Sequence, residues 1–150
     1  MDDIDRAILR ELQLDGRLSM HDLSARVGLS ASPCARRVRL LEDSGMIRGY
    51  AAVLDEAKLG FGVCVFVSVK LDRQVDDALT NFETRIKSYP EVVDCWLMTG
   101  PRDYLLRIAA ADLVEFEEFL THRLTRIAGV SSIESSIPLR RVKAASARRA

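Results

Sequence analysis

Three arginines stand close together in LSASPCARRVRLLEDSG, residues 29–45. Helical spacing, at 100° per residue, would give this stretch an apolar face and, opposite it, a polar face. The apolar positions are Cys34, Val38 and Leu41, and the polar positions are Ser32, Arg36 and Arg39. A guanidinium pairs bidentately with guanine in the major groove of DNA, and a hydroxyl reaches bases or phosphates. The polar face therefore predicts a contact with DNA.

Other residues near this face could contact the phosphate backbone. Arg37 lies at its flank, where it is better placed for phosphates than for bases. Ser30 begins the helix, whose free first amides attract anions, and Pro33 is tolerated there because those amides have no partner within the helix. Arg48 follows on a short extended run, residues 46–55, that could act as a small wing. The alternative is a solvated face on which the arginines pair with neighbouring acidic residues.

The place of the arginines in the chain favours the contact with DNA. Apolar residues at helical spacing predict two earlier helices, which begin at Asp2 or Asp3 and at Ser19. They end near Gly16 and at Gly28. Only Gly28 and one further residue separate the second helix from the third, which is the connection expected of a helix-turn-helix. The arginines then lie on its second helix.

The rest of the chain predicts an α+β domain. Alternating apolar residues indicate strands, and apolar residues at helical spacing indicate helices. The expected strands cover residues 61–71, 91–99, 102–110 and 130–142, and the expected helices cover 75–89 and 113–127, the latter capped by Asp112 with Leu113 on its inner side. The order βαββαβ is that of a ferredoxin-like sandwich, in which both helices cover one face of an antiparallel sheet.

Four segments follow from these patterns. They are a helix-turn-helix domain over residues 1–54, a linker over 55–60, an effector-sensing and oligomerisation domain over 61–143, and a basic tail over 144–150. The tail could add a phosphate contact.

The strand VVDCWLM, residues 92–98, is apolar on both faces although helices can cover only one. Strict alternation separates Val92, Trp96 and Met98 from Val93, Cys95 and Leu97. The uncovered face predicts an interface with another subunit. The alternative is a half-exposed surface that tolerates apolar residues. This interpretation is the weaker one, because the strand contains a tryptophan.

Composition restricts the function. The 22 basic and 22 acidic residues give a formal net charge of zero, so any DNA contact must be a local patch. Cys34, Cys64 and Cys95 are odd in number and scattered, which indicates neither disulfides nor a zinc site. We expect no metal and no cofactor. The acidic N-terminus and the lack of a long apolar run predict a cytoplasmic protein with no membrane contact.

Nearly the whole chain, to about Lys143, resembles one family of regulators. Residues 5–55, DRAILRELQLDGRLSMHDLSARVGLSASPCARRVRLLEDSGMIRGYAAVLD, resemble the N-terminal domain of the leucine-responsive regulatory protein/AsnC transcription regulators. MTGPRDYLLRIAAADLVEFEEFL and GVSSIESSIPLRRVK resemble their C-terminal domain. The resemblance implies a regulator that binds double-stranded DNA near promoters and responds to an amino acid. It also implies a homodimer built on the C-terminal sheets, commonly assembled into tetramers or octamers.

The resemblance further implies an effector site at the turn between the second and third strands. In such regulators the turn usually reads Gly-Asp-aromatic-Asp, and small amino acids bind near it at a contact between dimers. Here Pro101 and Arg102 replace the first Asp and the aromatic residue, whereas Asp103 remains. Asp103 could hold an α-ammonium, and amides near Gly100 could hold a carboxylate. The candidate effector residues are Thr99, Gly100, Arg102, Asp103, Tyr104 and Ser135.

Two outcomes follow for this turn. Arg102 would either favour a ligand with an extra carboxylate or abolish the ordinary ligand response. The alternative is a plain hairpin turn in which Pro101 fixes φ and Asp103 bonds to local backbone.

Two other functions are possible. The two-domain architecture also resembles that of siroheme decarboxylases. Their reaction needs proton-transfer groups, and the sequence suggests no partner for His21 or His122. An architectural DNA-compacting protein would bind DNA with little sequence preference. We expect a sequence-preferring regulator, not an enzyme, whose dimer places two reading helices about 34 Å apart on a pseudo-palindromic site.

Overall fold

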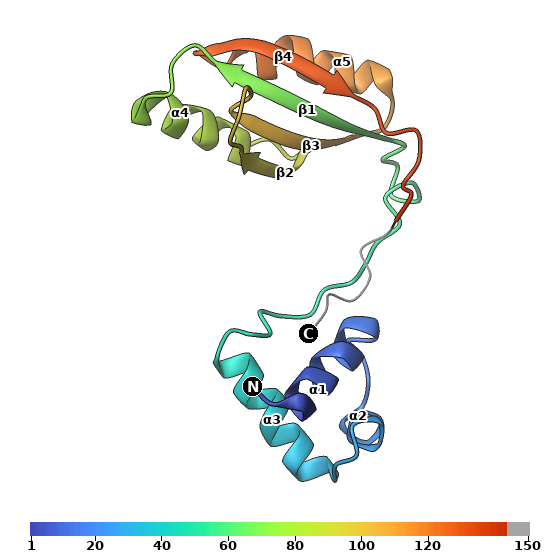
Figure 1. Ribbon diagram of the computed structural model, residues 1–150. Helices are drawn as coiled ribbons and strands as arrows, with labels where there is room; N and C mark the ends of the chain where they lie inside the picture. The colour runs from blue at the N-terminus through green and yellow to red at the C-terminus, as the bar shows by residue number, and fades with distance from the viewer. Residues whose placement is uncertain (144–150) are drawn as a thin grey trace. The chain divides into compact units, whose positions relative to one another are not determined.

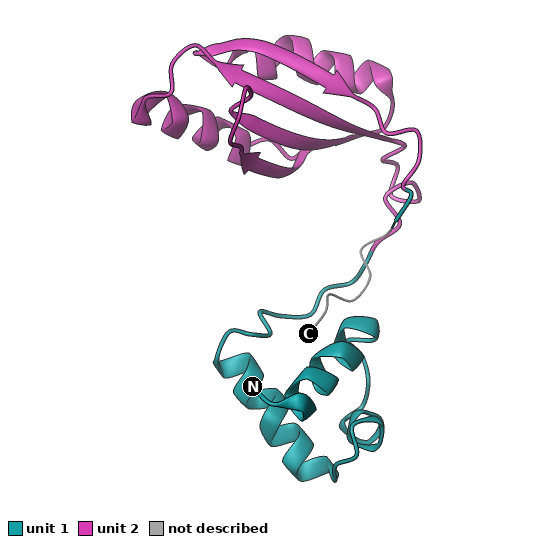
Figure 2. Ribbon diagram, in the orientation of Figure 1, with its two compact units in different colours: residues 1–53, 142–150 teal, residues 54–141 magenta. Residues whose placement is uncertain are grey.

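The computed structural model describes residues 1–143. The chain folds into two compact units, one containing residues 1–53 and the other residues 54–141 (Figures 1 and 2). The basic tail expected at 144–150 lies outside the described residues. Among those described, no helix is both long and apolar enough to cross a bilayer.

The first unit is built from three helices, whose starts follow the predicted caps. The helices are α1 (Asp3–Leu14), α2 (Met20–Arg26) and α3 (Ala31–Asp43). Asp2 accepts a hydrogen bond from the Asp5 amide, and the Asp5 carboxylate accepts one from the Asp2 amide, which completes a capping box. Ser19 accepts from the Asp22 amide in the same way. Ser30 holds the cap position of α3 but makes no side-chain cap bond.

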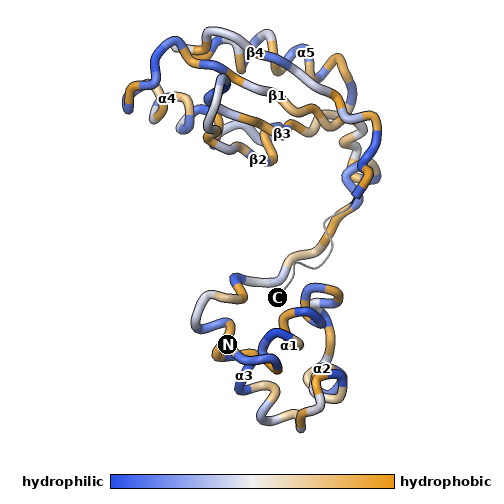
Figure 3. The backbone as a smooth tube through the Cα atoms, in the orientation of Figure 1, coloured by the Kyte–Doolittle hydropathy of each residue, from blue (hydrophilic) through white to orange (hydrophobic). Residues whose placement is uncertain are grey.

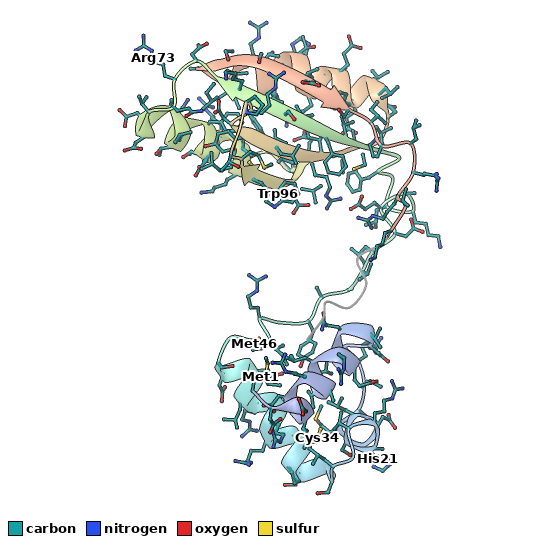
Figure 4. The ribbon with its side chains drawn as sticks, in the orientation of Figure 1. Met1, His21, Cys34, Met46, Arg73 and Trp96 are labelled. Carbon is teal, nitrogen blue, oxygen red and sulfur yellow. The ribbon has the colours of Figure 1, made fainter. Side chains whose placement is uncertain are left out.

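The core of this unit is small and closes around the tight turn. Gly28 has φ of 71°, a left-handed conformation that a residue with a Cβ adopts only with strain, and the Leu29 amide donates to the Ser24 carbonyl at 2.9 Å. Cys34 of α3, labelled in Figure 4, is fully buried. The buried core residues are Ile8, Leu23, Cys34, Val38 and Leu41. Thus the predicted helix-turn-helix is confirmed.

The extended run after α3 forms no β-ladder in the described chain. The Ile47 amide donates to the Leu41 carbonyl at 3.0 Å, and the Tyr50 hydroxyl donates to Glu42 at 3.0 Å. Arg48 is exposed on this run. The extended run that sequence spacing suggested for a wing therefore lacks a pairing partner among the described residues.

The second unit is the predicted ferredoxin-like sandwich. Its elements are β1 (Val63–Leu71), α4 (Asp76–Lys87), β2 (Val92–Leu97), β3 (Tyr104–Ala110), α5 (Leu113–His122), the short 3₁₀ helix η1 (Leu124–Arg126) and β4 (Val130–Ser136). The four strands form one antiparallel sheet in the order β2-β3-β1-β4. The α+β fold class and the order βαββαβ are thus confirmed.

The elements of the second unit are shorter than predicted, and two of them by five residues or more. The second helix of the sandwich ends at His122, and Leu124 and Ile127 reach the core through η1 instead. The last strand ends at Ser136 rather than at residue 142, and Pro138, which has no amide hydrogen for a ladder, follows closely. Leu113, expected on the inner side of its helix, is 55% exposed in the first turn.

Helices cover one face of the sheet only. Alternate residues of β1 are fully buried, and the central strands β1 and β3 are largely hydrophobic (Figure 3). Both α4 and α5 pack on this face, through Phe82 and Ile86 and through Phe116 and Phe119 (Figure 1). The residues of β1 and β3 that face them include Val65, Val67, Val69, Leu106 and Ile108. We call the opposite side the open face.

Candidate nucleic-acid interface and effector turn

Helix α3 presents an exposed polar ridge opposite a buried face. Cys34, Val38 and Leu41 are buried, as the 100° spacing predicts. Ser32, Arg36 and Arg39 are exposed, and so are Ser30 and Pro33 at the start of the helix. Since a rigid helix holds the two guanidinium groups on its outer side, they can enter a groove without unfolding the core.

Arg37 differs from the other two arginines because α1 binds its side chain. Its Nη1 atom lies 2.8 Å from Asp2 Oδ2 and 2.7 Å from Asp5 Oδ1. The Asp5 amide and the Arg37 guanidinium both hold the pKa of Asp2 below its usual value. Arg37 thus ties α3 to the capping box of α1, and its contact with phosphates stays a prediction.

Arg48 stands apart from the exposed ridge. It lines an open cleft of about 560 Å³ together with Leu9 and Leu12 of α1 and with Tyr50. This cleft lies between α1 and the run that follows α3.

The turn between β2 and β3 is a tight, hydrogen-bonded hairpin. The Met98 amide donates to the Asp103 carbonyl at 2.8 Å, and Gly100 has φ of 108°. Lys70 of β1 donates from Nζ to the Pro101 carbonyl at 3.2 Å. Thr99 and Gly100 are exposed at the tip.

Asp103 is buried and fully engaged within the chain. It is 2% exposed, and its carboxylate accepts from the Leu71 amide at 2.6 Å and from Gln74 Nε2. Its own amide donates to the Val69 carbonyl at 2.9 Å. The carboxylate thus bonds to β1 and to the segment after it rather than to local backbone, and its contact with a ligand stays a prediction. It joins the hairpin to the end of β1.

Two further candidates lie away from the tip of the turn. Tyr104 is buried against Phe82, with ring centroids 4.5 Å apart, and its hydroxyl donates to Glu83 at 3.0 Å. Burial and this carboxylate raise the pKa of the Tyr104 hydroxyl. Ser135 pairs with Val67 in the β1–β4 register and so belongs to the helix-covered side of the sheet.

Arg102 is the candidate that reaches the open face. Its Nη1 donates to Ser132 Oγ at 2.6 Å, and its Nη2 donates to Glu134 Oε2 at 2.8 Å. Sequence reasoning missed both partners, and the β4 residue among its effector candidates was Ser135. Only the strand register could have found them, because Lys70 pairs with Ser132 across β1 and β4.

The open face combines exposed apolar side chains with one ion network. Trp96, labelled in Figure 4, is 44% exposed and lies opposite Leu105 of β3. Arg107 donates from Nε to Asp94 at 2.7 Å and from Nη1 to Glu56 at 2.9 Å, and both carboxylates raise its pKa. Glu56 belongs to the turn that precedes β1, so the network fixes this turn on the sheet.

A bulge in β2 changes the predicted alternation. The register shifts between Val92 and Asp94, so Val92 pairs with the buried Ile108 on the helix-covered side. Strict alternation had grouped Val92 with Trp96, which instead shares the open face with Asp94.

Comparison with known protein families identifies the family of this chain. The description Lrp/AsnC ligand binding domain matches residues 64–147, and the description winged helix-turn-helix DNA-binding matches residues 1–48. The chain belongs to the Lrp/AsnC family. This Lrp/AsnC chain is a transcriptional regulator with a DNA-binding and a ligand-binding domain.

Its relatives match over nearly their whole length. The Bkd operon transcriptional regulator of Pseudomonas aeruginosa is 49% identical over 147 residues, which are 98% of this chain and 96% of the relative. The leucine-responsive regulatory protein of Escherichia coli is 41% identical over 143 residues, 95% of this chain and 87% of the relative. The crystal structure of a transcriptional regulator from Neisseria meningitidis in an L-Met complex has a TM-score of 0.94 and 38% identity. That match covers 99% of this chain and 96% of the other.

Cys95, His21 and His122 are among the other side chains of this Lrp/AsnC chain that could take part in chemistry. Burial raises the pKa of the Cys95 thiol to about 11, with a further contribution from Glu83, so the thiol stays protonated and weakly nucleophilic near neutral pH. Within residues 1–143, no three His, Cys, Asp or Glu side chains form a cluster that could hold a metal ion. His21 and His122 are both exposed.

Proposed function

We propose that this regulator binds double-stranded DNA as a dimer and reads bases with Arg36 and Arg39. The observation that carries the proposal is the exposed ridge of α3, which lies opposite the buried Cys34, Val38 and Leu41 on the second helix of a tight helix-turn-helix. The guanidinium groups would pair with guanines in the major groove. Ser32 would contact a base or phosphate, and the exposed start of α3 at Ser30 and Pro33 would approach the backbone, as would Arg48.

The open face of the sheet supports the dimer. Trp96, Leu105 and Phe66 place apolar surface on a side that no helix within residues 1–143 covers. A second copy with the same face would bury it, and the two-fold symmetry would set two reading helices about 34 Å apart on a pseudo-palindrome. Further association into tetramers or octamers would be controlled by the effector.

We propose an amino acid as the effector, bound beside the turn at residues 99–104. The ligand-binding domain and the L-Met complex of the Neisseria meningitidis relative support this class. The exposed residues of the turn are Thr99, Gly100 and Pro101, with the partly buried Arg102 at its edge. Asp103 and Tyr104 would shape the site from beneath rather than contact the ligand.

Capture of genomic DNA by the purified protein tests the proposal. Fragments from the source genome are bound near physiological salt and sequenced. A regulator enriches a few sites that share a pseudo-palindrome, with a ratio of specific to nonspecific affinity of about 10³ or more. Even capture across the genome would favour DNA compaction instead, and no capture with or without amino acids would contradict DNA reading.

Loss of Arg36 or Arg39 should change base preference as well as affinity. For each alanine variant we expect about 1–3 kcal/mol weaker binding to the preferred site and a flattened preference at one base position. Selection from randomised sites measures the preference. Arg10→Ala on α1 is the control, because it removes an equal charge from another helix. Unchanged preference in both Arg36→Ala and Arg39→Ala would refute their role as base readers.

Loss of Arg37 should act through the position of α3. We expect Arg37→Ala and Asp5→Asn to weaken binding to all sequences alike, by about threefold, since each removes part of the same surface ion pair. The slope of log affinity against log salt should stay unchanged. A direct phosphate contact predicts otherwise: Arg37→Ala would reduce the slope by about one, and Asp5→Asn would strengthen binding by releasing the guanidinium.

A further inference from the structure

Arg102 already has an acidic partner of its own chain. Its guanidinium binds Glu134 at 2.8 Å and Ser132 at 2.6 Å, both from β4. The Arg102 side chain is 34% exposed and that of Glu134 is 64% exposed, so the pair lies at the surface beside the turn. The two bonds engage one N–H on each terminal nitrogen of Arg102, and the charge of Glu134 offsets the cation that a ligand carboxylate would need.

The surroundings of this pair hold Glu134 in reach. Glu134 lies opposite Ser68 and Ser132 lies opposite Lys70, both in the β1–β4 ladder, so strand pairing fixes both acceptors. Lys70 itself donates to the Pro101 carbonyl and thereby holds the turn near the same ladder. Arg102 is therefore held in place by its bonds to Ser132 and Glu134, whose backbone positions the β1–β4 ladder sets.

We propose that Glu134 is a specificity-determining residue of the effector site. It occupies Arg102 and rejects amino acids with a second carboxylate, so the site takes amino acids with uncharged side chains. A dicarboxylic ligand would have to displace Glu134 or lie beside it as a like charge, and either costs affinity. The inference rests on the proposed effector site at the turn, and it reverses the expectation that Arg102 favours an extra carboxylate.

Calorimetry with the full-length protein tests the inference. L-Methionine, L-leucine, L-glutamate and L-aspartate are titrated into the wild type and into Glu134→Gln, which keeps the size of the side chain and removes its charge. The wild type should bind a neutral amino acid at least about tenfold more tightly than glutamate or aspartate. Glu134→Gln should gain at least about tenfold in affinity for a dicarboxylic ligand and change less than about threefold for the neutral one.

Two further variants identify the group responsible. Arg102→Ala combined with Glu134→Gln should lose the gain for dicarboxylic ligands, since the free guanidinium is then absent. Glu118→Gln removes a charge from an exposed position of α5, on the helix-covered side, and should behave as the wild type. Circular dichroism confirms that each variant is folded.

Each contrary result has its own meaning. Tighter wild-type binding of glutamate or aspartate than of any neutral amino acid would overturn the specificity role and leave the effector site intact. An unchanged profile in Glu134→Gln would overturn it as well. The wild type is also screened against all twenty amino acids. If it bound none of them, the proposed effector class itself would fail, and the inference with it.

Discussion

Leu105→Asp should yield a folded monomer that binds a pseudo-palindromic site at least about 100-fold more weakly than the wild type. Leu105 lies on the open face between Ser68 of β1 and Trp96 of β2. A carboxylate there would be buried without a partner when two copies meet, and that cost opposes association. Once dimers are lost, the two reading helices bind independently, and the gain from a shared complex disappears.

Sedimentation and DNA titration measure the two effects. Leu113→Asp is the matched control, because it introduces the same carboxylate at a half-exposed leucine of α5, on the helix-covered side. It should remain a dimer and keep its affinity for DNA. If Leu105→Asp sedimented with the wild type, the open face would not be the dimer interface.

Asp103→Ala should destabilise the second unit by about 2–4 kcal/mol. The substitution removes the buried carboxylate that accepts from the Leu71 amide and from Gln74. The Leu71 amide would then lie unpaired where water reaches it poorly, whereas the exposed Gln74 amide could turn to water. Asp103→Asn retains an acceptor for the Leu71 amide and should cost less than half as much.

Trp96 makes this measurement specific. It is the single tryptophan of the chain and belongs to the second unit, so its fluorescence during urea unfolding reports that unit and not the helix-turn-helix. Circular dichroism at helical wavelengths follows the whole chain. A shift of less than about 0.5 kcal/mol for Asp103→Ala, the size of an ordinary surface change, would contradict the role of Asp103 as a buried anchor.

Features set by local spacing could be predicted from the sequence. The caps at Asp2, Ser19 and Asp112 satisfy amides within three residues, and the structure contains all three. The two faces of α3 follow from 100° per residue in the same way. The order of elements then specified the sandwich, because few arrangements of βαββαβ bury both helices.

Features set by distant contacts could not be predicted in this way. Arg37 and Asp2 are 35 residues apart, and Arg102 and Glu134 are 32 apart, so no local pattern joins them. The bulge at Val93 puts Val92 on the face opposite to that of Trp96, which a strict period of two cannot represent. Asp103 matched a family motif, but its burial depends on where the end of β1 lies.

The bond between Arg37 and the capping box has a practical consequence for how this regulator is handled. Asp2 uses both its amide and its carboxylate in that box, one residue from the start of the printed sequence. A purification tag or a blocking group joined here would crowd the two carboxylates that bind Arg37 of α3. An N-terminal tag could then imitate a defect in DNA recognition. A tag placed elsewhere would distinguish the effect of the tag from a true defect.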